Sequence, residues 1–366
     1  MTEDPAVLQG PGPRITKELE ARGWSQKDLA EVLGRPLQAI NEIVNKSKQV
    51  TPETAVQLGQ AFGTTAEYWA NLEALYRVRL AKRTTEISGV ERRSRLFAIA
   101  PVSELIRRGW IRTTERIDEL EHAVCEFLEI GDLHEEPRAP VAKLRHTPSR
   151  DPETRAQVAW IKRAEALVRD QDVGQFDAAK FGKAIPSLFD LARSPSDVAG
   201  LPDALAGLGV HFVVVPHLPK TYLDGAAFRV GQQPVIALTL RYDRLDNLWF
   251  TFAHEAAHVA HGDGGVLDDR PDRADRKKDP TERAADRTAS AWLIDPVAYS
   301  TFREATADTP TRQQIESFAQ RVGRHPSIVV GRLQHDDVIS WSQHRWAHEP
   351  IRSWLAPWID QVPQAA

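Results

Sequence analysis

Residues 249–262, WFTFAHEAAHVAHG, combine a helical apolar pattern with three histidines. His254 and His258 are four residues apart, so both imidazoles lie on one face of the helix, about 5–6 Å apart at Cβ. Two imidazole nitrogens at that separation can bind one metal ion. The alternative is an apolar helix that carries histidines without a metal. The helical spacing extends back to residue 241, with apolar side chains at Leu245, Leu248, Trp249, Phe252, Ala256 and Val259.

Glu255 is next to the first histidine of this pair. At that position its carboxylate can reach a metal-bound water without displacing it. The spacing is H-E-x-x-H, the signature of the zinc peptidases called zincins, in which the glutamate is the general base. A chain of 366 residues carries this pattern by chance roughly once in a hundred. The motif alone is therefore suggestive, and a third ligand would strengthen it.

Three candidates compete for the third ligand. His261 is a further turn along the same helix and does not easily close a tetrahedron. The metzincin pattern fails because Gly262 comes too late and no histidine follows it. The segment DPTERAADRTASAWLIDP, residues 279–296, remains: Asp279 and Pro280 open a new amphipathic helix with Glu282 in its first turn. Two histidines and one glutamate leave a fourth position open, as in catalytic zinc sites.

Asp286 is one turn after Glu282 and faces the same way. We expect it to accept a hydrogen bond from the far nitrogen of a ligating histidine and so to set its tautomer. H-E-x-x-H followed by E-x-x-x-D is the gluzincin arrangement. The alternative for Glu282 and Asp286 is a solvated helix face. The pattern predicts Zn²⁺ as cofactor and metal-assisted hydrolysis, with Glu255 taking a proton from the attacking water.

A small β-sheet is expected before this helix. Three runs have strand character: GVHFVVVPHLP (209–219), DGAAFRV (224–230) and PVIALTL (234–240). We expect the last run to be an edge strand that pairs with an extended substrate. The charged segment VLDDRPDRADRKKDP, which follows the helix, is predicted to be a solvated loop, with a lid as the alternative. Four side chains are unranked candidates for stabilising an oxyanion: Tyr222, His217, Tyr242 and His325.

The N-terminal region predicts several short helices with clear ends. Ser25 can cap a helix that Gly34 stops, Pro36 suits the first position of the next, and Thr51 with Pro52 opens a third. Two short helices joined by a glycine turn are typical of a helix-turn-helix. The expected apolar faces are Leu29, Ala30, Val32 and Leu33 in the first helix and Leu37, Ile40, Ile43 and Val44 in the second.

The outward positions of the second helix carry amides, which can contact adenine edges, and lysines follow, which can reach phosphates. Residues 1–80 hold nine Lys and Arg against ten Asp and Glu, so we expect modest DNA affinity and dimeric binding. A helical bundle that pairs with protein is the alternative. The predicted DNA-binding residues are Gln26, Arg35, Gln38, Asn41, Asn45 and Lys46.

The composition narrows the setting. Lys and Arg total 47 against 51 Asp and Glu, so no global field attracts nucleic acid or a membrane. The single cysteine, Cys125, excludes an internal disulfide framework and fits a reducing compartment. The start of the sequence, MTEDPAVLQGPGPR, lacks a secretion signal, and no uncharged apolar run is long enough to span a membrane. We expect a cytoplasmic protein.

The predicted fold class is mainly α with a small β-sheet (α+β). The expected organisation is a disordered leader (1–13), a helix-turn-helix domain (14–80), a basic linker and helical connecting region (81–200), a zincin-like domain (201–345) and a C-terminal tail (346–366). Prolines predict a loop at residues 134–152 within the connecting region.

Two family resemblances follow from these segments. SQKDLAEVLGRPLQAINEIVN (25–45) and TPETAVQLGQAFGTTAEYWANLEALY (51–76) resemble HigA antitoxins and the wider Xre/Cro repressors. DGAAF, PVIALTLRYDRLDNLWFTFAHEAAHVAHG and ERAADRTASAWLIDP resemble the ImmA/IrrE metallopeptidases over roughly residues 200 to 340. The second resemblance implies that His254, His258 and Glu282 bind zinc, or manganese in some accounts, and that Glu255 is catalytic. Most members carry Asn where this chain has Asp286.

The order of modules resembles long HigA-type regulators that carry an ImmA domain. The resemblance implies an antitoxin-like DNA-binding regulator whose endopeptidase cuts an Xre-type repressor, a partner antitoxin or itself. Operator DNA and a toxin are further candidate partners. The geometry of DNA half-sites, and not the resemblance, leads us to expect a homodimer. The alternative is an antitoxin or repressor whose metal domain senses or scaffolds without proteolysis.

Overall fold

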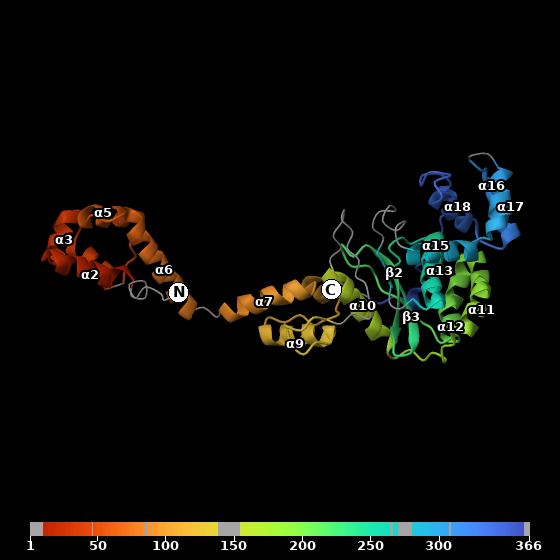
Figure 1. Ribbon diagram of the computed structural model, residues 1–366, viewed down its shortest axis with the longest axis horizontal. Helices are drawn as coiled ribbons and strands as arrows, with labels where there is room; N and C mark the ends of the chain where they lie inside the picture. Colours follow the sequence, from red (N-terminus) through yellow and green to blue (C-terminus); the bar gives the residue numbers. More distant parts are fainter. Residues whose placement is uncertain are drawn as a thin grey trace. The chain divides into compact units, whose positions relative to one another are not determined.

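The structure is a computed structural model that describes residues 10–45, 47–84, 87–137, 154–263, 266–269, 280–306 and 309–361 (Figure 1). It divides into two compact units, Met1–Arg92 and Arg93–Ala366. Helices predominate, and a single sheet of four strands lies in the second unit among the described residues. The predicted class, mainly α with a small sheet, is confirmed.

The first unit is a bundle of helices around one core. Its helices are α2 (Pro11–Arg22), α3 (Gln26–Leu33), α4 (Leu37–Val44), α5 (Pro52–Phe62) and α6 (Ala66–Thr84). α2 begins at Pro11, so the expected disordered leader is wrong for residues 11–13, because Ile15 and Leu19 anchor this helix in the core. Residues 1–9 lie outside the described part.

The helix ends of this unit follow the sequence signals. Ser25 and Asp28 form a reciprocal capping box on α3, and Gly34 ends it in the left-handed region at φ 63°. Thr51 caps α5. The buried stripes are narrower than expected, since Val32 is 52 % and Leu37 43 % exposed. The expectation that these two side chains belong to the core is wrong; Leu29, Leu33, Ile40 and Ile43 fill it.

The sheet of the second unit has the strand order β1-β3-β2-β4. The strands are β1 (His211–Val214), β2 (Leu223–Val230), β3 (Gln233–Leu238) and β4 (Val266–Asp269). β3 pairs parallel with β1 and antiparallel with β2, so it is internal and the expected edge position is wrong. β4 pairs with β2. Residues 266–269 of the charged segment are therefore a strand and not a loop, and residues 270–279 lie outside the described part.

Two apolar layers cover the two faces of the sheet. α13 (Leu245–His261) packs on one face, where Phe212, Ala227 and Ile236 point. The other face, with Val213 and Phe228, belongs to a core that includes α10 (Thr154–Val168). α7 (Ile87–Ile99), α8 (Val102–Arg107) and α9 (Ile117–Leu128) join this second core, and most of the expected loop, residues 138–153, lies outside the description.

The remaining helices contribute to the same apolar core as α13. They are α11 (Ala178–Leu188), α12 (Leu201–Ala206), α15 (Pro280–Leu293), α16 (Pro296–Glu304), α17 (Arg312–Val322) and α18 (Pro326–His335), with short 3₁₀ turns at Phe189–Arg193, Pro195–Gly200, Arg345–Ala347 and Ala356–Trp358. None of the helices described here is long and apolar enough to cross a membrane.

The expected C-terminal tail is an integral part of the second unit as far as residue 361. Ile359 bridges to Val214 of β1, and the buried Asp360 accepts hydrogen bonds from Trp110 and Arg163. Ile351 and Leu355 are fully buried. The connecting region and the tail therefore meet in one folded unit, because Asp360 of the tail is hydrogen-bonded to Trp110 and Arg163 of the connecting region.

Candidate metal centre and nucleic-acid interface

α13 carries the predicted ligands inside the protein. It starts at Leu245 and ends at Gly262, whose φ of 74° turns the chain out of the helix. The apolar positions expected on this helix are buried. His254, Glu255 and His258 have no measurable exposure. Three ionisable groups buried side by side are costly unless they bind something or each other, which is typical of a functional site.

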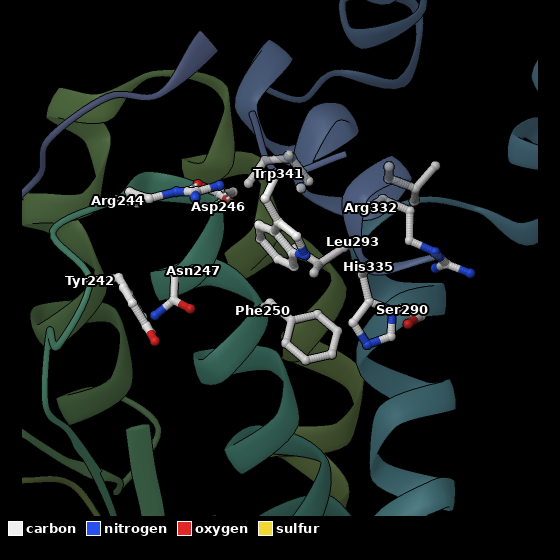
Figure 2. A pocket seen from close by; sticks show the side chains of 13 residues that line it. Tyr242, Arg244, Asp246, Asn247, Phe250, Ser290, Leu293, Arg332, His335 and Trp341 are labelled. Atoms are coloured by element: carbon white, nitrogen blue, oxygen red, sulfur yellow. Dashed lines mark hydrogen bonds and ion pairs between the residues drawn. The ribbon is translucent and has the colours of Figure 1, made fainter. Parts of the chain in front are cut away.

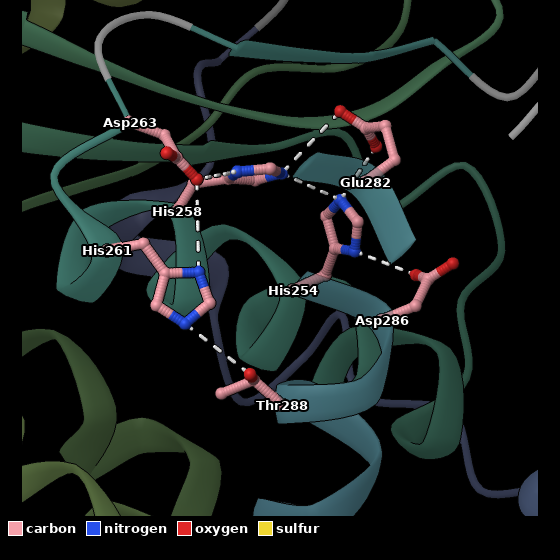
Figure 3. Close-up of polar contacts among 7 residues, drawn as sticks. All are labelled: His254, His258, His261, Asp263, Glu282, Asp286 and Thr288. Carbon is pink, nitrogen blue, oxygen red and sulfur yellow. Dashed lines mark hydrogen bonds and ion pairs between the residues drawn. The ribbon is translucent and has the colours of Figure 1, made fainter. Parts of the chain in front are cut away.

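The structure brings the three predicted ligands together (Figure 3). The Nε2 atoms of His254 and His258 are 3.1 Å apart. Glu282, in the first turn of α15, places one oxygen 3.3 Å from Nε2 of His254 and the other 3.7 Å from Nε2 of His258. This cluster is the one potential metal-ligating group found in the part of the chain that the structure describes.

The outer nitrogens of both histidines face carboxylates. Nδ1 of His254 is 2.9 Å from Asp286, as expected from the sequence. Nδ1 of His258 is 3.1 Å from Asp263, which the sequence analysis missed. A carboxylate accepts, so each Nδ1 donates and each Nε2 is left with its lone pair toward the centre when the ring is neutral.

Asp263 reaches His258 because the helix has just ended. Gly262 reverses the chain, and the backbone N–H of Asp263 donates to the carbonyl of His258 at 3.0 Å. The signal available in the sequence was a glycine directly followed by an acid at the end of the helix. That signal is weak, since most such acids are simply solvated.

The electrostatics favour a neutral ring at His258. Burial, together with the nearby His254, lowers the pKa of His258, against the opposing effect of Asp263 and Glu282. Two neutral imidazoles that point their lone pairs at each other across 3.1 Å, beside a carboxylate, repel unless a cation lies among them. Nitrogen and carboxylate donors in this number suit Zn²⁺, with a fourth position left over. The residues present therefore fit the metal that the motif implies.

His261 is not brought to this centre. Its ring is 35 % exposed, and its nitrogens lie 3.9 Å from Asp263 and 3.4 Å from the hydroxyl of Thr288. The sequence argument against it as a ligand agrees with this placement.

Glu255 lies on the side of α13 that faces the sheet. A Cβ on Gly225 of β2 would approach its Oε1 to 3.0 Å and the Cγ2 of Thr251 to 2.9 Å. A residue without a side chain is therefore required where the carboxylate meets the strand. Among the oxyanion candidates, His325 caps α18 and so has a local role.

The expected DNA-binding residues divide into two groups. Gln38 and Asn41 are exposed on α4, and Asn45, directly after the helix, is exposed as well. Gln26 and Arg35 are half-buried, and the guanidinium of Arg35 donates to Gln57 at 2.7 Å, which ties it to α5. Lys46 lies outside the described residues.

Comparisons with known proteins concern the first unit. Residues 15–69 match the HTH_3 helix-turn-helix family. Virulence-associated protein I of Dichelobacter nodosus is 34 % identical over 82 residues, 22 % of this chain and 74 % of that protein. The HTH-type transcriptional regulator YbaQ of Escherichia coli strain K12 is 32 % identical over 83 residues, again 22 % and 74 %.

A solved structure of an addiction module antidote protein of a HigA family from Coxiella burnetii shares 32 % identity. The match covers 21 % of this chain and 85 % of that one, with a TM-score of 0.21. The family match and the first relative carry the assignment of the first unit. Through residues 15–69 the chain belongs to the HTH_3 helix-turn-helix family.

Proposed function

We propose that this chain is a DNA-binding regulator whose second unit is a zinc-dependent endopeptidase acting on a repressor or partner protein. The observation that carries the enzymatic half is the convergence of His254, His258 and Glu282 donors, each histidine backed by a carboxylate. The regulatory half is supported by the helix-turn-helix match and by YbaQ, which is named a transcriptional regulator. Its antitoxin-like character rests on the HigA resemblance of residues 25–76.

The chemistry follows from the donor set and from Glu255. A zinc ion held by the two Nε2 atoms and the Glu282 carboxylate would supply a Lewis acid that polarises the scissile carbonyl. Glu255 takes the proton of the attacking water and passes it to the leaving nitrogen. Asp286 and Asp263 hold the imidazoles in the orientation that presents Nε2.

We assign substrate recognition to β4. The strand expected from the sequence, β3, is internal and has no free edge for a peptide. β4 is the edge strand next to β2, and β2 carries Gly225 against Glu255. An extended peptide that pairs with the outer edge of β4 gains backbone hydrogen bonds on the side of the sheet edge nearest to β2.

The DNA half of the proposal uses α4. The exposed amides Gln38, Asn41 and Asn45, on the helix or directly after it, have the chemistry to contact adenine edges in a major groove. Since the unit is not basic overall, we propose that it binds operator DNA as a dimer, which doubles the contacts.

The first experiment measures metal content by mass spectrometry on the purified full chain after zinc is supplied. We expect about one zinc per chain in the wild type, loss of zinc in Glu282→Ala, and no change in Glu304→Ala, an exposed glutamate of α16. A wild type without zinc would overturn the metal centre.

The second experiment tests proteolysis with Glu255→Gln, which leaves the three proposed ligands in place. Protein N-termini are compared by enrichment and mass spectrometry in cells that produce either the wild type or this variant. New termini present only with the wild type are expected. Identical sets of termini would contradict the peptidase and support a domain that binds metal and senses or scaffolds.

A further inference from the structure

A cavity of about 400 Å³ lies beside α13, and none of the proposed metal ligands is among its lining residues (Figure 2). Its walls come from the first turns of α13, the last turns of α15, and α18. Trp341, which follows α18, points its indole into the cavity toward Phe250. The size is that of a small-molecule site.

The walls are mainly apolar and partly aromatic. Phe250, whose ring packs against His335, and Trp341, whose ring lies near the guanidinium of Arg244, contribute aromatic surface to the wall, and Leu293, Ile294 and Ile328 line the same space. Trp341 is 53 % exposed and Tyr242, also in the wall, is 46 % exposed. Exposed aromatic side chains around a concave apolar space are costly to leave in water and are typical of ligand sites.

The charged groups of the wall are already paired. Arg244 makes two contacts with Asp246, at 3.0 and 2.6 Å, and Arg332 lies 2.7 Å from Asp336. The Asp246 carboxylate lies 2.8 Å from where a Cβ of residue 331 would stand, so Gly331 makes room for this ion pair. A charged ligand would have to compete with these pairs. The remaining polar groups, Asn247 and Ser290 among them, can form hydrogen bonds with a neutral ligand.

We propose that this cavity binds a neutral aromatic small molecule that carries a hydrogen-bonding group. The ring packs against the aromatic side chains Phe250 and Trp341, and the polar group bonds to Asn247 or Ser290. This site makes the chain a receptor for a small ligand in addition to its proposed activity.

A ligand in the cavity would also contact the two helices that carry the proposed metal centre. This part of the inference rests on the proposed function. Phe250 precedes His254 by one turn of α13, and Ser290 follows Asp286 by one turn of α15. The ligand therefore contacts the same two helix faces that hold His254 against Asp286.

The test uses the metal-free full chain with 2-naphthol as the probe and naphthalene-2-sulfonate as its anionic counterpart. Binding is followed by saturation-transfer NMR titration. We expect saturable binding of 2-naphthol with a Kd of about 1 mM or tighter, and weaker binding of the sulfonate. Because the metal is absent, this result stands or falls independently of the peptidase.

Three variants locate the binding. Trp341→Ala should weaken 2-naphthol binding about fivefold or more through the lost ring contact, and Ser290→Phe should block it by filling the cavity. Trp354→Ala removes an indole of similar exposure, 43 %, outside the cavity and should leave the affinity unchanged. Circular dichroism checks that each variant is folded. No saturable binding by the wild type, or equal affinity in all four proteins, would overturn the proposal.

Discussion

Asp263 and Asp286 hold the two imidazoles of the proposed metal centre through their outer nitrogens. Each bond sets a tautomer and a ring orientation at once. Carboxylates in this position affect metal affinity without touching the metal, because a misoriented imidazole no longer aims its lone pair at the ion.

Replacing Asp263 by Asn should therefore weaken zinc binding about 10- to 100-fold while leaving the fold intact. The affinity is measured by competition with a chelating dye. Asp203→Asn, an exposed aspartate of α12, is the matched control. Equal zinc affinity of the Asp263 variant and the control would show that this carboxylate does not orient His258.

Asp336 gives a residue-level prediction for pH. Burial by itself raises its pKa, but hydrogen bonds from His335 and Arg332 outweigh that effect and lower the pKa to about 2. Since the folded pKa is below the ordinary value of 3.8, the ionised group stabilises the fold above pH 3.8, and this stabilisation is lost as the pH falls toward 2.

We expect Asp336→Asn to lower the free energy of unfolding by about 1–2 kcal/mol at pH 7, a value reduced because the side chain is 30 % exposed. The difference from wild type should shrink by pH 2.5. Urea unfolding at both pH values measures it, with the exposed Asp172→Asn as control. A difference that does not depend on pH would contradict the assigned pKa.

At the scale of elements, the contact between α13 and β2 depends on a missing side chain. Gly225 faces Thr251 and Glu255 at distances that a Cβ cannot share. Gly225→Ala should move the helix or the carboxylate, with a loss of stability of about 1–3 kcal/mol. Thermal unfolding measures the loss. Gly182→Ala in α11, where a Cβ meets no atom within 4 Å, should be neutral or slightly stabilising. Equal thermal stability of the two variants would show that the close approach of Gly225 to α13 does not affect stability.

The second prediction at this scale concerns α4. Operator DNA is first obtained by in vitro selection. Because the amide of Asn41 is expected to contact a base edge, Asn41→Ala should weaken binding to this DNA by about 1–3 kcal/mol. Gln60→Ala, an exposed amide on α5, is the comparison. Fluorescence anisotropy on operator DNA obtained by in vitro selection measures both, and an unchanged affinity for Asn41→Ala would remove that residue from the interface.

At the scale of the whole molecule, each unit contains its own site. All three proposed ligands and both supporting carboxylates lie in the second unit, and the helix-turn-helix lies in the first. A chain that starts at residue 87, which keeps α7 whole, should bind about one zinc with the affinity of the full chain. Zinc titration of both proteins measures this. A loss of zinc binding in the shorter chain would show that the first unit supports the metal centre.

Several local features of this protein could be predicted from the sequence alone. Helix caps at Ser25 and Thr51, the start of α15 at Pro280, and the placement of His254 and His258 on one helix face all depend on residues a few positions apart. The geometry of a helix fixes such relations locally, so spacing and chemistry are enough to predict them.

The tertiary structure decided the rest. The internal position of β3, the edge position of β4 among the described strands, the burial of Ile351, Leu355 and Asp360, and the cavity around Phe250 and Trp341 depend on which distant segments pack together. Asp263 reaches His258 only because the chain reverses at Gly262. These outcomes depend on the burial of apolar surface between elements far apart in the chain. The spacing of residues within one element does not show which distant elements will pack together.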